Sequence, residues 1–425
     1  MPIERSLARF CIAHRRTGRF IQEGGTTFCE LAGISRFCFA MNLVAAFSAA
    51  CCIASLIYYV AAWAIAMGFA RRASSPPAPL PKVAPRVAVL KPLHGADRNL
   101  PENLVSYLEV DYPKVEFIFG VSGYDDEAAA VVVSLKPQYP FRQITLAVGE
   151  QPGCANRKVA KLIGMGDRPA RAEIFVLSDA DVSVERDHLR RIVSEFDSDE
   201  QIGLITCLYR AKAGSGLASR LAALFVNTDF VPLVMISKTV EPLRYSLGAT
   251  VAIKREALEA IGGFQRLKDL LADDYYLGKF VSERGYKIRL SSSIVTTRSG
   301  ERRLAEFWNH QLRWVRTYRT TRPISLATIV LHGPFWASVL LAAARCSIFA
   351  LSLFAAVIVT RIVTSRLMIG KVLGLTGQRS DAWLAPLKDL LMTAVWAAGL
   401  FSNEVLWGGR RLRIQPDGTM REIFH

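Results

Sequence analysis

The chain has 425 residues, of which 51% are hydrophobic, and a formal net charge of +16. This length allows two or more domains, and the clustering of apolar residues into long uncharged runs excludes an ordinary soluble protein. The eight cysteines contain no Cys-x-x-Cys pair, which argues against a zinc site or a disulfide framework. Because positive charge beside membrane segments usually pairs with anionic headgroups, we expect anionic membrane lipids, and no nucleic acid, as partners.

The N-terminal region is predicted to anchor the chain in a membrane. Residues 1–36 form a basic tail, and residues 37–70 carry no charge, which is longer than the ~20 residues that span a bilayer. A transmembrane helix is therefore expected at 37–70. The run is too long and begins too late for a cleaved signal peptide. Met41 lies inside it, and a start there would leave residues 1–40 out of the mature protein.

A Pro-rich linker at 71–85 precedes an alternation of strand-like and helix-like segments that extends to residue 300. This alternation predicts βαβ units, an α/β fold and a mostly parallel sheet with helices on both faces. Strands are expected at 86–92, 115–121, 144–148, 174–177, 202–207 and 246–253, and helices at 100–108, 127–135, from 156, at 254–261 and from 273 to near 285. The apolar segment 215–237 is expected to lie against the membrane surface.

Two carboxylates follow the buried-type strand at 174–177. Asp179 and Asp181 are two residues apart, so in extended chain their side chains share one face. Ligands of open α/β sheets gather outside the carboxyl ends of such strands. A divalent ion such as Mg²⁺ or Mn²⁺ takes one or two carboxylates together with substrate phosphates. The alternative interpretation is the N-cap of the helix that follows.

Further acidic pairs stand at the ends of other elements. Asp125 and Asp126 follow the second strand, and Asp273 and Asp274 begin a helix. The first pair alone is more typical of a turn or helix cap than of a functional site. The second pair alone is as compatible with a helix cap as with a catalytic pair. Lys91, before Pro92, is alone more typical of a solvated strand end.

Residues 301–322 form an amphipathic helix that is expected to lie at the headgroup level. His310, Arg313 and Trp314 share one face of it. Taken alone, His310 would be an ordinary surface or core histidine, and Arg313 with Trp314 a snorkelling pair at the interface. Charge-free runs at 324–344, 346–360 and 390–403 predict two to four membrane segments within 323–405, followed by a basic tail at 406–425.

Several motifs together are similar to a known family. They are Lys91-Pro92-Leu93-His94-Gly95-Ala96-Asp97, Gly262-Gly263-Phe264, Ala272-Asp273-Asp274-Tyr275-Tyr276 and His310-Gln311-Leu312-Arg313-Trp314. They resemble family-2-type glycosyltransferases of the GT-A fold, and most closely the ceramide glucosyltransferase family. Asn156-Arg157-Lys158-Val159 and Thr206-Cys207-Leu208-Tyr209-Arg210 resemble its bacterial branch associated with hopanoid biosynthesis. The similarity covers roughly residues 86–322.

The resemblance implies a membrane-bound inverting enzyme that moves one sugar from UDP-N-acetylglucosamine or UDP-glucose to a lipid hydroxyl, in that branch a hopanoid polyol such as bacteriohopanetetrol. Its catalytic domain, 86–300, would face the cytosol at the bacterial inner membrane. The implied nucleotide-binding residues are Lys91, Pro92, Asp125, Asp126, Lys158, Asp179 and Arg313, the metal ligands Asp179 and Asp181, and the catalytic residues Asp273, Asp274, His310, Arg313 and Trp314.

The chemistry explains these roles. A departing diphosphate needs nearby cations, such as a metal or Arg313. A lipid hydroxyl needs a carboxylate to take its proton. Asp274 is the candidate base, and like-charge repulsion from Asp273 is expected to raise its pKa.

Two positions depart from the family pattern. His310 stands where many relatives have Gln or Arg, and Gly123 where the animal enzymes carry Asp. Ceramide or diacylglycerol as acceptor, a processive polysaccharide synthase and a non-catalytic membrane scaffold are the alternatives.

Overall fold

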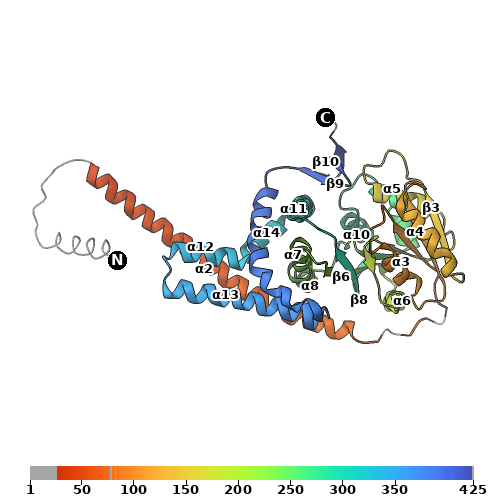
Figure 1. The fold of residues 1–425 in the computed structure, drawn as a ribbon, viewed down its shortest axis with the longest axis horizontal. Helices are drawn as coiled ribbons and strands as arrows, with labels where there is room; N and C mark the ends of the chain where they lie inside the picture. The colour runs from red at the N-terminus through yellow and green to blue at the C-terminus, as the bar shows by residue number, and fades with distance from the viewer. Residues whose placement is uncertain (1–25, 77–78, 82, 424–425) are drawn as a thin grey trace, which may run out of the picture.

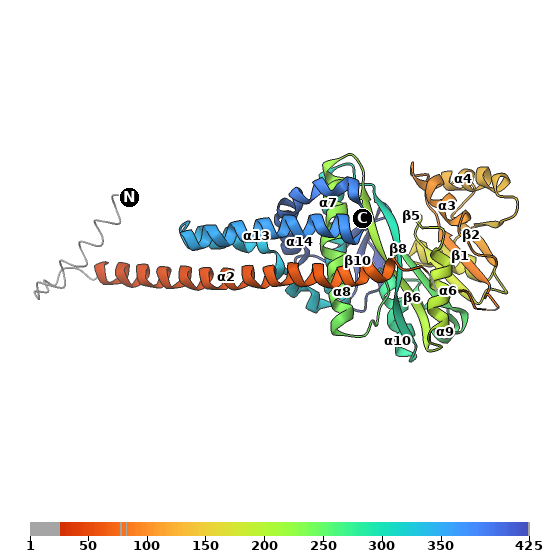
Figure 2. The ribbon, with the colours of Figure 1, turned by 90° about the horizontal axis from the view of Figure 1, so that it is seen from below.

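The structure is a computed structural model that describes residues 26–76, 79–81 and 83–423. An α/β unit lies at one end, and a bundle of long apolar helices projects from it (Figures 1 and 2). Residues 1–25, most of the predicted basic tail, lie outside the described residues. Met41 lies within helix α2 (Thr26–Ala73), and an alternative start there stays a prediction. Residues 26–36 are helical and continue into the first membrane helix.

The α/β unit is built on one mixed sheet with the strand order β3-β2-β1-β4-β7-β6-β8-β5. The pairs β1/β2, β2/β3, β1/β4 and β6/β8 are parallel, whereas β4/β7, β6/β7 and β5/β8 are antiparallel. The strands are β1 Val87–Pro92, β2 Val115–Val121, β3 Gln143–Val148, β4 Ile174–Ser178, β5 Val182–Ser183, β6 Ile202–Ala213, β7 Thr250–Lys254 and β8 Lys287–Ser299. The predicted mostly parallel α/β fold is confirmed, and the one long strand that the sequence did not indicate is β8.

Helices cover both faces of this sheet. Val87 and Val89 of β1 pack into the cluster that contains α3, α4 and α6, whereas Ala88 and Leu90 pack into the cluster with α5, α9 and α10. Because successive strand residues point to opposite faces, a strand covered on both sides needs an unbroken apolar run. The helices are α3 Leu100–Leu108, α4 Glu127–Leu135, α5 Arg157–Gly166, α6 His188–Asp197, α9 Arg255–Ala260 and α10 Asp273–Glu283.

The helical bundle contains three helices that are long and apolar enough to cross a membrane: Phe39–Ala73, Leu217–Val240 and Ile348–Val372. A fourth span exists if Pro323–Leu331 and Gly333–Ala343, bent by 54°, are counted as one. The elements are α2 Thr26–Ala73, α7 Leu217–Phe225, η2 Val226–Phe230, α8 Val231–Val240, α11 Leu304–Thr321, η4 Pro323–Leu331, α12 Gly333–Ala343, α13 Ile348–Leu367, η5 Met368–Val372, η6 Thr376–Leu384 and α14 Ala385–Gly399.

Two segments differ from the sequence-based expectation. The segment 215–237, expected against the membrane surface, forms one helical run of α7, the π-helical turn η2 and α8. This run is long and apolar enough to cross a membrane, is 67% buried over its most apolar window, and packs against β6 and α2. The expected basic tail at 406–425 is folded. It forms most of an antiparallel sheet of β9 Glu404–Trp407, β10 Arg410–Ile414 and β11 Met420–Glu422.

The C-terminal sheet is held in place by a glycine turn and by the loop before α10. Gly408 and Gly409 both have positive φ, 56° and 75°, as a two-residue hairpin turn requires. Leu270 forms a β-bridge with Thr419, so the sheet packs against the loop that leads into Asp273.

Candidate active site

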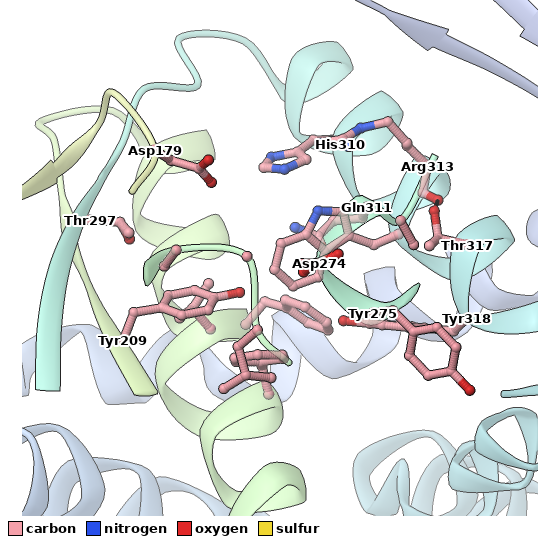
Figure 3. A pocket seen from close by; sticks show the side chains of 18 of the residues that line it. Asp179, Tyr209, Asp274, Tyr275, Thr297, His310, Gln311, Arg313, Thr317 and Tyr318 are labelled. Carbon is pink, nitrogen blue, oxygen red and sulfur yellow. Dashed lines mark hydrogen bonds between the residues drawn. The ribbon is translucent and has the colours of Figure 1, made fainter. Parts of the chain in front are cut away.

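A cavity of about 890 Å³ lies between the carboxyl ends of the central strands, α10, α11 and the membrane helices. One end is polar and includes Lys158, Asp179 and Asp274, whereas the other is walled by apolar and aromatic side chains such as Leu233 and Trp396. Figure 3 shows Asp179 on one side, His310, Arg313 and Tyr318 of α11 on the other, and Asp274 between them. The fold therefore brings most of the predicted site residues to one place.

Lys91 of β1 supports the loop that contains Asp179 and Asp181. The Lys91 ammonium is fully buried and donates to the carbonyl oxygens of Asp179 at 2.7 Å and Val182 at 3.1 Å and to Ser178 Oγ at 3.3 Å. Burial, opposed by Asp181 and Asp179, lowers the pKa of Lys91 to about 7. The predicted nucleotide contact does not match this geometry, because Lys91 is sealed from the cavity; we infer that it positions the loop.

Lys158 joins two of the predicted acidic groups. Its ammonium lies 2.7 Å from Asp179 Oδ1 and 3.3 Å from Asp273 Oδ2. Burial opposes its charge, but these carboxylates outweigh burial and raise the pKa of Lys158 well above its usual range. Asn156 caps α5 by accepting from the Val159 amide at 3.1 Å, and it donates to Asp273 Oδ1 at 3.3 Å. The start of α5 therefore holds the side chains of both Lys158 and Asp273.

The carboxylates of Asp179 and Asp181 suit a divalent ion that also binds substrate phosphates. Burial and the neighbouring Asp179 raise the pKa of Asp181 to about 6, so a cation at this loop would relieve their repulsion. Among the described residues, no group of three or more His, Cys, Asp or Glu side chains forms a metal cage. A metal held here would therefore need ligands from the substrate.

Asp274 faces the cavity from the first turn of α10. Burial and then Asp273 raise its pKa to about 6, although Lys158 opposes the shift. Ser246 Oγ donates to the Asp274 carbonyl at 2.6 Å. A side chain at Gly248 would place its Cβ 2.8 Å from Asp274 Oδ2. Any other residue there would therefore force the Asp274 carboxylate to move. The raised pKa agrees with the expected repulsion, with burial as the larger cause.

The half-buried Arg313 side chain lies at the cavity wall, and in the part of the chain that the structure describes it has no hydrogen bond or salt bridge. Loss of solvent lowers its pKa, while Asp274 and Asp179 nearby oppose the shift. A partly desolvated cation without a partner gains by pairing with an anion. The arrangement therefore favours an anionic ligand beside Arg313.

His310 and Trp314 have clear packing roles on the same helix. His310 Nδ1 lies 2.6 Å from Glu301 Oε1, and its ring meets Trp314 edge-on at 5.5 Å. Trp314 also contacts Phe225 and Phe230, each at 5.7 Å between ring centroids. These contacts clamp α11 onto α7 and η2, while both side chains still line the cavity.

The Asp125–Asp126 pair lies apart from this cavity. Asp126 caps α4, accepting from the amides of Ala128 at 3.0 Å and Gly95 at 2.8 Å. These bonds outweigh burial and lower its pKa. Asp125 is exposed, and neither residue lines the cavity. The helix-cap alternative thus describes Asp126, and the geometry does not support the predicted nucleotide contact.

Comparison with known proteins shows the family of this chain. The family model described as Glycosyl transferase family 21 matches residues 40–420. The chain belongs to glycosyl transferase family 21. It is 28% identical over 232 residues to ceramide glucosyltransferase 3 of Caenorhabditis elegans, covering 55% of this chain and 50% of that protein. It is 19% identical over 234 residues to a poly-β-1,6-N-acetyl-D-glucosamine synthase of Staphylococcus epidermidis, covering 54% of each.

The chain thus spans about half the length of the curated relatives it matches. A solved mannosyltransferase from Pyrobaculum calidifontis, in complex with GDP-Man and Mn²⁺, is 24% identical, with a TM-score of 0.49, and the match covers 81% of this chain and 99% of that one. The predicted resemblance to the ceramide glucosyltransferase family is confirmed, and the hopanoid branch stays a prediction.

The cavity of this family 21 member also contains residues that sequence reasoning missed. Gln311, inside the quoted α11 motif, is buried with its Oε1 unpaired. Because Gln311 belongs to the same sequence motif as Arg313, the motif could have identified it as a candidate site residue. Tyr59 of α2 and Trp407 of β9 also line the cavity. No sequence signal indicated them, because they come from a membrane helix and from a segment expected to be a tail.

Proposed function

We propose that this protein is a membrane-bound inverting glycosyltransferase that moves one sugar from a UDP-sugar to a lipid hydroxyl. The observation that carries the proposal is that one cavity joins the charged group of Asp179, Asp274 and Arg313 to a wall of apolar helices. This wall includes Tyr59 of the candidate membrane span α2 and Trp396 of α14. A water-soluble nucleotide suits the first end and a lipid suits the second.

The polar end would hold the donor. Arg313 has the charge and the free donors to bind the diphosphate from the cavity wall, and a planar guanidinium can bind two of its oxygens at once. We infer that Asp179 and Asp181 hold Mg²⁺ or Mn²⁺, which, when bound, neutralises charge on the leaving diphosphate. Lys158 orients Asp179 and adds a second fixed cation.

Asp274 would activate the acceptor. The lipid hydroxyl oxygen forms a bond to the anomeric carbon of the sugar as the bond from that carbon to the diphosphate oxygen breaks, and the diphosphate leaves with the electron pair. The hydroxyl proton passes to the Asp274 carboxylate. A pKa of about 6 suits this role, because the group is mostly ionised near pH 7 yet more basic than an ordinary aspartate. Displacement in one step inverts the anomeric centre.

We propose a hopanoid polyol such as bacteriohopanetetrol as acceptor, with ceramide as the alternative that the names of the curated relatives support. We also propose that residues 86–300 form the catalytic domain and face the cytosol, where UDP-sugars are made, at a bacterial inner membrane. Anionic lipids would pair with the basic residues near the ends of the membrane helices.

The test is product analysis with the full chain in lipid nanodiscs. Labelled UDP-N-acetylglucosamine and UDP-glucose are each offered with bacteriohopanetetrol or ceramide, and the products are identified by mass spectrometry. A lipid carrying one sugar, absent with Asp274→Asn, is expected. Polymer as the product would instead identify a processive synthase, and UDP binding with no product from any pair would identify a non-catalytic scaffold.

A further inference from the structure

Four charged side chains meet inside the helical bundle. Arg361 of α13 lies 2.8 Å from Asp229 of η2 and 2.8 Å from Asp389 of α14. Lys388 also contacts both aspartates, at 2.6 Å in the case of Asp389. Asp229 and Arg361 both belong to helices long and apolar enough to span a membrane. The cluster has no net charge, which limits the cost of burying it.

Asp229 differs from the other three in its access to the cavity. Its side chain is 29% exposed, against 2% for Asp389, 4% for Arg361 and none for Lys388. It lines the same cavity as Asp274, and neither Asp389 nor the two cations do. It lies on the π-helical turn η2, and such turns are frequent at functional sites.

The Asp229 carboxylate keeps hydrogen-bonding capacity toward the cavity. Oδ1 accepts from Arg361, and Oδ2 accepts from Lys388 and from Thr228 Oγ1 at 3.2 Å. A carboxylate has about four acceptor positions, so at least one remains. An ionised carboxylate only accepts hydrogen bonds, and therefore a ligand that meets it must donate one.

The surroundings of Asp229 define the rest of that ligand. The wall beside it is formed mainly by apolar side chains, including Phe230, Leu233 and Leu331. The nearby Tyr59 hydroxyl is already used, because it donates to the Leu331 carbonyl at 3.0 Å and accepts from the Gly333 amide at 3.2 Å. His332, another polar side chain that lines the cavity, has Nδ1 2.8 Å from Thr393 Oγ1.

We propose that Asp229 is an acceptor-binding residue that selects lipids with a second hydrogen-bond donor, a hydroxyl or an amide N–H, besides the hydroxyl that receives the sugar. The inference rests on the proposed lipid acceptor and adds the specificity of its site. Polyols and N-acyl sphingoid bases have such a second donor. Diacylglycerol has one free hydroxyl, and once that hydroxyl faces Asp274 nothing remains to meet Asp229.

The test compares Asp229→Asn with Asp389→Asn in the full chain in detergent. Both variants remove one negative charge from the same cluster, but only Asp229 reaches the cavity. Because Arg361 and Lys388 bond different oxygens of Asp229, asparagine at 229 can keep only one of these contacts. Its NH₂ replaces the other acceptor with a donor, which repels a donor of the ligand. Equilibrium binding is measured for bacteriohopanetetrol, N-hexanoylsphingosine and dioctanoylglycerol, with UDP affinity as the donor-side control.

We expect the wild type to bind bacteriohopanetetrol or N-hexanoylsphingosine on the order of tenfold or more tightly than dioctanoylglycerol, as one charge-assisted hydrogen bond allows. Asp229→Asn should abolish this preference and leave UDP affinity unchanged, whereas Asp389→Asn should keep it. Equal loss of the preference in both variants, a preference that survives Asp229→Asn, or no wild-type preference would each overturn the proposal.

If either variant fails to fold, lipid binding to the wild type alone still tests the proposal. N-hexanoylsphingosine methylated at its amide nitrogen and secondary hydroxyl should bind no better than dioctanoylglycerol, and unchanged binding would overturn the inference. A wild type that shows the expected preference but transfers sugar to none of the lipids would refute the proposed function and leave the role of Asp229 standing.

Discussion

Replacing Asp274 by asparagine separates proton transfer from every other task of the site. Asparagine keeps the size of the side chain and one hydrogen-bonding oxygen but cannot take the proton of an acceptor hydroxyl. The expected loss in the rate of sugar transfer is about 10²–10⁴-fold, the usual contribution of one general base. UDP affinity should hold or improve, because Arg313 and Lys158 remain and one negative charge beside them is gone.

The pH dependence follows from the same carboxylate. With a pKa raised to about 6 by burial and by Asp273, Asp274 is about 90% ionised at pH 7 and about 10% at pH 5. The transfer rate of the wild type should therefore fall about tenfold between these values, whereas an aspartate at its ordinary pKa would lose almost nothing. The pKa of Asp181 is also raised to about 6, but saturating metal would keep that group ionised.

The assay is single-turnover transfer between pH 4.5 and 8 at saturating Mg²⁺, with UDP affinity measured by calorimetry. Asp111→Asn is the matched control, because Asp111 is exposed and paired with Arg190 at 2.7 Å, away from the cavity. An Asp274→Asn variant that keeps transfer within tenfold of the wild type, or that keeps the acid limb, would refute the assignment of the base.

Three further predictions concern the donor and the membrane. Asp181→Ala should abolish transfer while the protein stays folded, and full wild-type activity in excess EDTA would contradict a metal at this loop. Arg313→Ala should weaken UDP binding as well as transfer, and Arg313→Lys should recover only part of both, since lysine lacks the planar fork; unchanged UDP affinity of the alanine variant would exclude the diphosphate contact. In intact cells an impermeant maleimide should label Cys346, which is exposed in the turn between α12 and α13, but not Cys154. Each is tested as the sole cysteine. Labelling of Cys154 would place the α/β unit outside the cytosol.

The core of the α/β unit was predictable because its strands are buried on both faces. Residues 115–121 form β2 and 127–135 form α4 as expected, since an unbroken apolar run followed by a capped helix has few other solutions. Asp179 and Asp274 line one cavity, as their positions at the ends of elements led us to expect, and their roles stay predictions. Asp126 was expected at the same site but caps α4 instead. In sequence, an aspartate after a strand looks the same whether it caps a helix or faces a ligand.

The features that could not be predicted depend on partners distant in the chain. The polar stretch 287–299 becomes a strand because β6 supplies its ladder. The segment 404–422 becomes a sheet because it pairs with itself and with the loop at Leu270. Asp229 and Arg361 are 132 residues apart, and only the packing of η2 against α13 shows that each neutralises the other.

The membrane wall of the cavity bears on how fast such an enzyme would work in a living cell. Tyr58 and Tyr59 of α2 and Trp396 of α14 form part of it, so on the proposed mechanism the acceptor arrives sideways from the bilayer and never crosses water. The acceptor concentration that sets the rate is then its mole fraction in the bilayer, not its amount per volume of solution. Diluting the acceptor with inert phospholipid should slow the enzyme even when the total amount per volume is constant. The cell could thereby change glycolipid output through membrane composition, with no change in enzyme or sugar-nucleotide.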